Sequence, residues 1–137
     1  MASRYDLAIG TEAGTLWDFS QYQPQAVIIN LGTNDYSTQG DPGQPFVDAY
    51  VDLLHQIRSH YPDAYLFCLI QWTSAPSSAP AINQAVATLT GEGDANVEAF
   101  DINVSQGGSG CDGHPDVAMH QAMGDRLAQE LARVLGW

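Results

Sequence analysis

The run Gln25-Ala26-Val27-Ile28-Ile29-Asn30-Leu31-Gly32-Thr33-Asn34-Asp35 decides the fold class, because an apolar, β-branched segment passes directly into a short polar one. Its apolar part, residues 25–31, is typical of a strand buried on both faces, as in a parallel sheet that helices cover. Residues 64–70 are a second run of this kind, and residues 96–102 favour a third strand. We therefore expect one parallel sheet.

Helical segments alternate with these strands. Residues 45–61, 80–90 and 115–135 carry apolar side chains at helical spacing, and each segment has a proline in its first turn. In the last segment, which Pro115 opens, the apolar stripe comprises Val117, Met123, Leu127, Leu131 and Leu135. The alternation predicts a three-layer α/β/α fold, with a parallel sheet flanked by helices.

The length of 137 residues suits a single domain over residues 1–137. Its opening part is less regular: residues 5–9 favour a strand, and residues 15–19 favour a helical turn. The first twenty residues lack the basic start and apolar block of a secretory leader, so we expect a soluble chain whose compartment is not assigned.

Charge restricts the partners of the chain. Sixteen Asp and Glu oppose only four Arg and Lys, which gives a formal net charge of −12. Such a surface repels polyanions, so we expect neither nucleic acid nor an anionic membrane as a partner. The two cysteines do not form a disulfide framework. Cys68 lies in an apolar strand, where a buried, inert thiol is expected.

Three segments are expected beyond the carboxyl ends of the strands, where parallel α/β sheets bind ligands: residues 32–43, 71–79 and 103–114. The first contains Gly32-Thr33-Asn34-Asp35. Glycine allows close backbone approach, and an asparagine after a strand can direct its amide at a developing oxyanion. The same residue types also form ordinary turns.

The third segment contains Gly110-Cys111-Asp112-Gly113-His114-Pro115. We expect His114 at the amino terminus of the last helix, where the helix dipole disfavours the imidazolium and keeps the ring able to accept a proton. Most single histidines are not catalytic, but this one shares its sheet edge with Asn34.

Together these two blocks resemble the third and fifth sequence blocks of the SGNH hydrolases, also called the GDSL esterase/lipase superfamily. The chain is similar to the carboxyl-terminal half of that fold, which is flavodoxin-like. The sequence of the two blocks is most similar to carbohydrate esterase family 2, the acetyl esterases of plant polysaccharides. The resemblance covers most of residues 17–137. It implies an esterase for short acyl, above all acetyl, esters, with a small acyl ester or acetylated sugar as ligand.

By position, the resemblance implies that Asn34 is an oxyanion donor and His114 the general base, while Gly32 shapes the loop and Asp35 braces it. The residue three before the histidine, which is an aspartate in most of the superfamily, is Cys111 here. Asp112 is the better candidate for orienting His114, and a backbone carbonyl is the alternative.

The nucleophile is not assigned. The superfamily carries it in a Gly-Asp-Ser block upstream, and none of the thirty-one residues before Gly32 forms such a block. The remaining candidates for nucleophile or substrate contact are Ser37, Ser74, Ser109, Cys111 and Trp72, the last as a stacking platform for a sugar ring. A water activated by His114 is a further option.

Two other interpretations stay open. The chain is also consistent with an inactive SGNH fragment that serves as a binding or assembly module. Without the upstream strands one sheet edge is unpaired, and because exposed edges invite pairing with another chain, we expect a homo-oligomer. No cofactor is expected. The histidine spacings indicate no metal site.

Overall fold

Three parallel strands form the sheet in the computed structural model, which describes residues 2–8, 10–71 and 77–137. The strands lie side by side in chain order, with Ala26 opposite Tyr65 and Leu66 opposite Val97: β1 (Ala26–Ile29), β2 (Tyr65–Ile70) and β3 (Val97–Asp101). They confirm the three predicted strands to within two residues. The predicted parallel α/β class is also confirmed.

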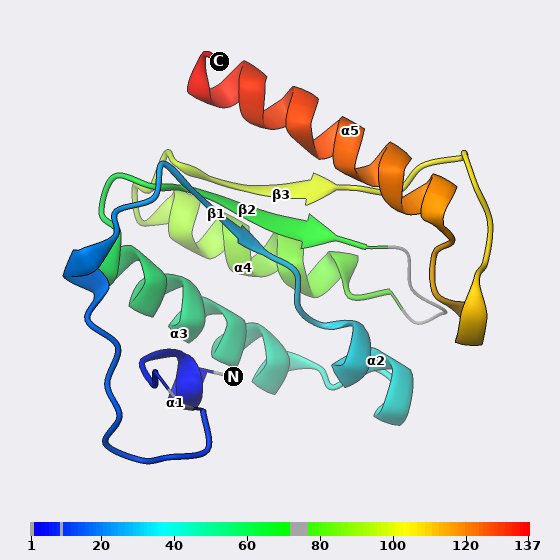
Figure 1. Ribbon diagram of the computed structural model, residues 1–137. Coiled ribbons are helices and arrows are strands. Elements are labelled where there is room, and N and C mark those ends of the chain that lie inside the picture. Colours follow the sequence, from blue (N-terminus) through cyan, green and yellow to red (C-terminus); the bar gives the residue numbers. More distant parts are fainter. Residues whose placement is uncertain (1, 9, 72–76) are drawn as a thin grey trace.

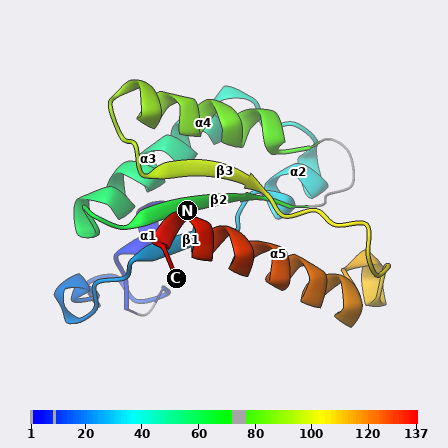
Figure 2. The same cartoon turned by 90° about the horizontal axis from the view of Figure 1, so that it is seen from above.

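Helices cover both faces of this sheet (Figures 1 and 2). Two of them, α3 (Gln44–His60) and α4 (Ala79–Gly91), lie on one face, and α5 (Val117–Leu135) lies on the other. The three helices match the predicted segments. The remaining helical elements are α1 (Ala2–Tyr5), α2 (Thr33–Gln39) and the short 3₁₀ turns η1 (Phe19–Gln21) and η2 (Cys111–Gly113).

The core is divided by the sheet. On the α3 and α4 side, buried residues of both helices pack against β1, β2 and β3, among them Tyr50, Leu54, Leu66 and Ile82. On the α5 side, the buried residues are Phe67, Leu69, Ile102 and Met123. None of the described helices has the length and apolar character that a membrane crossing requires.

Burial of β1 on both faces, which its apolar sequence predicted, is wrong. Ile28 is 46% exposed, whereas its register neighbour Phe67 on β2 is fully buried. The two side chains share the α5 face, so the apolar cover of that face is incomplete at the edge strand. β2, which lies between two strands, has the predicted burial.

The start of α5 also differs from the prediction. The helix begins at Val117, and the Oδ1 atom of Asp116 accepts a hydrogen bond of 2.8 Å from the Met119 amide. Asp116 is therefore the N-cap, and Pro115 precedes the helix. Val117 is 87% exposed and does not belong to the apolar stripe.

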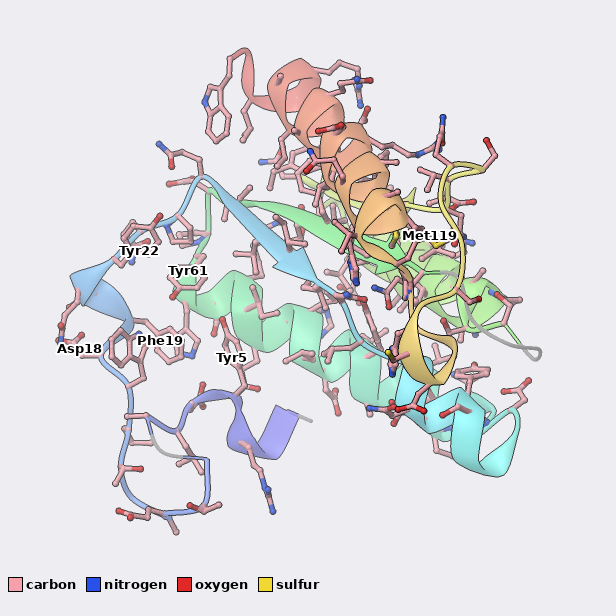
Figure 3. All side chains as sticks on the ribbon, turned by 45° about the vertical axis from the view of Figure 1, so that its right-hand side comes forward. Tyr5, Asp18, Phe19, Tyr22, Tyr61 and Met119 are labelled. Carbon is pink, nitrogen blue, oxygen red and sulfur yellow. The ribbon has the colours of Figure 1, made fainter. Side chains whose placement is uncertain are left out.

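The opening segment is held to α3 by aromatic and polar contacts (Figure 3). The Phe19 ring stacks on His60 at 3.7 Å between centroids, and the Tyr5 ring stacks on Phe19 at 5.4 Å. Asp6 accepts hydrogen bonds from Gln56 at 2.6 Å and from His60 at 2.9 Å. These contacts fix the segment although its secondary structure is sparse.

The two predictions for this segment are wrong. Tyr5 ends a helix, and beyond it the described backbone forms only an isolated antiparallel bridge between Leu7 and Leu16 rather than a strand. The helical turn lies at Phe19–Gln21, later than residues 15–19, because Asp18 caps it by accepting from the Ser20 amide. Ile9 lies outside the described residues.

Candidate active site

The first part of the site follows β1. Gly32 has φ of 112°, and a Cβ atom at this position would lie 3.1 Å from Cζ of Phe46. Glycine is required both by the backbone angle and by this close approach. The next seven residues form α2, so the segment after Gly32 is helical. Asn34 is the second residue of this helix and is exposed.

Tyr36 anchors α2 to the core. It is only 3% exposed, and its ring meets the Phe46 ring edge-on at 5.2 Å between centroids. Burial, together with the Asp41 carboxylate, raises the pKa of Tyr36, so its phenol stays neutral. Because Tyr36 points into the core, α2 has a fixed orientation. Asn34 and the half-buried Asp35 are held on its first turn.

A hydrogen bond of 3.3 Å from Thr33 Oγ1 to Gln71 Oε1 ties the start of α2 to the end of β2. Sequence reasoning did not predict this contact. Neither residue type at these positions signals a partner thirty-eight residues away. The bond contributes to the position of the first turn that carries Asn34.

The second part of the site is the segment between β3 and α5. A Cβ atom at Gly107 would collide with the Met119 backbone and the Asp116 carboxylate, so the chain passes very close to the start of the helix. The Asp116 amide donates to the Gly108 carbonyl at 2.8 Å, and the Gly110 amide donates to the His114 carbonyl at 2.6 Å. These bonds close the segment into a compact loop.

His114 lies at the end of that loop and is exposed. Its amide donates to the Cys111 carbonyl at 3.1 Å. The expectation that His114 stands at the helix terminus is wrong, because two residues separate it from Val117 and the second of them, Asp116, is the N-cap. The helix dipole therefore acts first on Asp116. The signal for this was available in the sequence, since aspartate is a preferred N-cap residue.

Asp112 adopts a left-handed conformation, with φ of 54°. Within the described residues, no side chain hydrogen-bonds the His114 ring, and the carboxylate of Asp112 is exposed. The role of Asp112 stays a prediction.

The two parts of the site lie beyond the same end of the sheet. α2 follows the carboxyl end of β1, and the loop with η2 follows the carboxyl end of β3; Figures 1 and 2 both show α2 and η2 at that end. Residues far apart in sequence thus share one edge. On α2 these are Asn34, Asp35 and Ser37, and on the loop they are Ser109, Cys111, Asp112 and His114.

Comparison with known proteins gives the family. The model of the GDSL-like lipase/acylhydrolase family matches residues 4–133. The chain belongs to this family. The resemblance read from the two sequence blocks is confirmed.

A curated esterase and solved structures of carbohydrate esterases are similar to the chain. The cellulase/esterase CelE of Acetivibrio thermocellus is 40% identical over 131 residues, which are 91% of this chain and 16% of that protein. The solved structure of a family two carbohydrate esterase from Clostridium thermocellum in complex with cellohexaose is 36% identical, with a TM-score of 0.86 over 98% of this chain and 43% of that one.

A family 2 carbohydrate esterase with a carbohydrate binding domain from Corynascus thermopiles is 32% identical to the chain. Its TM-score is 0.78, over 100% of this chain and 45% of the other. The chain thus spans less than half the length of these two carbohydrate esterase structures, and about a sixth of the length of CelE.

The described residues restrict the choice of nucleophile in this GDSL-family chain. Cys68 is fully buried, and burial raises the pKa of its thiol to about 12, so it is not a thiolate at neutral pH. This confirms that Cys68 is an inert core residue. Cys111 is exposed. Two predicted contacts, Trp72 and Ser74, lie outside the described residues. The described residues contain no cluster of three or more His, Cys, Asp or Glu that could hold a metal.

Proposed function

We propose that the chain is a carboxylic ester hydrolase in which His114 is the general base and Asn34 donates to the oxyanion. The observation that carries this proposal is the common position of α2 and the loop before α5 beyond the carboxyl end of the sheet. Membership of the GDSL-like lipase/acylhydrolase family supports it. Neither Asn34 nor His114 alone would support the proposal.

The chemistry follows from the two groups. His114 removes a proton from the attacking nucleophile or water, and an ester carbonyl then becomes a tetrahedral oxyanion. The side-chain amide of Asn34 stabilises that negative charge. The protonated His114 gives its proton to the leaving alkoxide. If water is the nucleophile, this step releases the carboxylic acid; if a side chain is the nucleophile, it leaves an acyl-enzyme, which a water activated by His114 then hydrolyses. In well-studied enzymes, removal of one oxyanion donor or of the general base lowers the rate constant of such a reaction by about 10²-fold or more.

Ser37 is one of the nucleophile candidates among the described residues. It lies three residues after Asn34 on α2, so both side chains share one face of the helix. The Ser37 hydroxyl donates to the Asn34 carbonyl at 3.4 Å. Ser109 and Cys111 in the loop, and a water activated by His114, are the alternatives. Asp112 is proposed to orient His114.

For the substrate we propose short acyl esters, above all acetyl esters of a neutral carbohydrate. Support comes from the names of the relatives, which are esterases, and from the cellohexaose bound to one of them. The net charge of −12 agrees with an uncharged sugar and disfavours a polyanionic one. We also propose that residues 1–137 fold as one domain, and that the chain forms a homo-oligomer because β1 is an edge strand.

Hydrolysis of p-nitrophenyl acetate by the purified chain tests the proposed reaction. The wild-type protein is expected to turn over, and His114→Ala and Asn34→Ala are each expected to lose about tenfold or more in kcat/KM. One matched control is His55→Ala, a residue of α3 whose ring forms an exposed pair with Glu92. The other is Asn96→Ala, at the opposite end of the sheet. Both controls should retain wild-type rates.

Absence of turnover in the wild type would overturn the proposal in favour of an inactive fragment that serves as a binding or assembly module. If the wild type is active, Ser37→Ala, Ser74→Ala, Ser109→Ala and Cys111→Ala test each side-chain candidate for the nucleophile. Retained activity in all four would favour attack by water. Asp112→Asn tests the orienting role by a displaced pH profile of kcat/KM.

A further inference from the structure

Gln71 lies at the centre of the carboxyl edge of the sheet. It follows the last residue of β2, and β2 lies between β1 and β3. β1 leads into α2, which carries Asn34, and β3 leads into the loop that carries His114. The strand order therefore places Gln71 between the two parts of the candidate active site. Figure 1 shows the end of β2 at the same end of the sheet as α2 and η2.

Backbone pairing fixes the height of Gln71 in the sheet. The register between β1 and β2, continued past the strand ends, places Gln71 level with Gly32, the residue before α2. On the other side, the Ile102 amide donates to the Ile70 carbonyl at 3.1 Å, so the ladder between β2 and β3 reaches the residue before Gln71. Gln71 is thus held at the level where the site begins.

The side chain of Gln71 is held in one orientation. Its Oε1 atom accepts a hydrogen bond of 3.3 Å from Thr33 Oγ1, and both residues are half-buried. The amide of a glutamine carries two N–H donors on its nitrogen. No described residue accepts a hydrogen bond from Nε2 of Gln71. These two donors are therefore available to a ligand.

Charge limits how this edge can stabilise an oxyanion. The chain has no lysine, and none of its four arginines lies in residues 32–43, 71–79 or 103–114. Neutral N–H groups are therefore the donors that these segments offer to a developing negative charge. Asn34 is one such side chain. Gln71 brings a second side-chain amide to the same edge, and its partner Thr33 directly precedes Asn34.

We propose that Gln71 is a second oxyanion donor of the site: Nε2 donates to the acyl oxygen of a bound ester, while Thr33 holds Oε1. This role rests on the proposed esterase function, since Gln71 belongs to the same site. The hydrogen bond strengthens as the carbonyl oxygen gains negative charge, so Gln71 lowers the barrier without taking up or releasing a proton. Thr33 is then a positioning residue that acts through Gln71.

Hydrolysis of p-nitrophenyl acetate separates a donor from a positioning residue. Gln71→Met keeps the length of the side chain but removes its donors, and we expect it to lower kcat by about tenfold or more with little change in KM. Thr33→Val removes only the hydrogen bond that orients the amide, so we expect a smaller loss. Gln23→Met is the matched control, because the Gln23 amide donates to the Phe19 carbonyl near the amino end of β1. It should keep the wild-type kcat.

Three kinetic results would overturn the proposal. The first is a Gln71→Met protein with the wild-type kcat. The second is a Thr33→Val loss as large as that of Gln71→Met, because Gln71 would then act only by holding Thr33 and the first turn of α2. The third is a loss confined to KM, which would indicate a contact that is equally strong in the ground state and the transition state.

Titration of the wild-type chain with acetate, followed by NMR of the side-chain amide signals, gives a readout that needs neither turnover nor a variant. Acetate presents the carboxylate oxygens of a hydrolysed acetyl group. We expect saturable shifts of the Gln71 and Asn34 NH₂ signals, and no shift of the Gln23 signal. Chloride at the same ionic strength should shift none of them.

The titration also separates the two proposals. If the wild type hydrolyses p-nitrophenyl acetate and the Gln71 signal does not shift, the role of Gln71 is overturned and the esterase function stands. If the wild type does not hydrolyse the ester, the esterase function is overturned. A saturable Gln71 shift would then still support a contact with acyl oxygen, and an unshifted signal would overturn that contact too.

Discussion

Arg58 and Asp94 form a two-point ion pair, with Nε to Oδ2 at 2.9 Å and Nη2 to Oδ1 at 3.2 Å. The same guanidinium donates to the carbonyls of Tyr61, Pro62, Ala64 and Asn96, at distances between 2.6 and 3.1 Å. Arg58 thereby joins the end of α3 to the starts of β2 and β3. It fixes the end of the sheet opposite the candidate active site.

We expect Arg58→Lys to lower the free energy of unfolding by about 2 kcal/mol, because an ammonium group keeps the charge but cannot reproduce the planar, multidentate fork. Urea denaturation measures this. Arg133→Lys is the matched control: Arg133 is exposed and bonds Glu130 on its own helix, so we expect a change below about 0.5 kcal/mol. Equal losses in the two variants would contradict the structural role of Arg58.

Gly32→Ala is expected to destabilise the chain by about 2 kcal/mol and to reduce esterase activity, since strained φ and the contact with Phe46 both displace the first turn of α2. Gly136→Ala is the control. Gly136 also has positive φ, but open space surrounds it, so only the backbone term of about 1 kcal/mol applies. Thermal unfolding and p-nitrophenyl acetate turnover are the measurements. A Gly32→Ala protein with wild-type stability and rate would contradict the account of the turn.

The pH dependence of the free energy of unfolding is expected to include a contribution from the Glu98 carboxyl group. Burial raises the pKa of Glu98, and its Oε1 atom is buried without a hydrogen-bond partner. The folded chain therefore binds this proton more tightly than the unfolded chain. The resulting stabilisation is present at acid pH and is lost as pH rises through the folded pKa. We expect Glu98→Gln to raise the melting temperature at neutral pH, with the difference shrinking as pH falls.

Glu130→Gln provides a control of opposite sign. The hydrogen bond from Arg133 lowers the pKa of Glu130, so the charged form favours the folded state and this contribution is lost as pH falls. Glu130→Gln should therefore lower the melting temperature at neutral pH. Melting curves of both variants across pH measure the two signs. A lower melting temperature for Glu98→Gln at neutral pH would show that its charge is stabilised in the fold.

The strands and long helices were predictable because their signals are local. Apolar β-branched runs gave β1, β2 and β3, and helical spacing gave α3, α4 and α5. α2 was not predictable in this way. Its sequence from Thr33 to Gln39 is polar, and its position depends on the burial of Tyr36 against Phe46, which comes from another helix.

The exposure of Ile28 was not readable either, since it depends on which strand forms the edge and how far α5 extends over the sheet. At the candidate site, the sequence predicted which segments share the sheet edge. It did not predict that the N-cap of α5 is Asp116, two residues after His114, because Pro115 also suited the first helical position.

The most direct test of the account is a double-mutant cycle in kcat/KM for p-nitrophenyl acetate, with wild type, Asn34→Ala, His114→Ala and the double variant. If the two residues act on one transition state, each single change loses about tenfold or more, and the double variant loses clearly less than the product of the single losses. Losses that multiply in full, or a wild type that does not turn over, would contradict the claim that Asn34 and His114 form one active site.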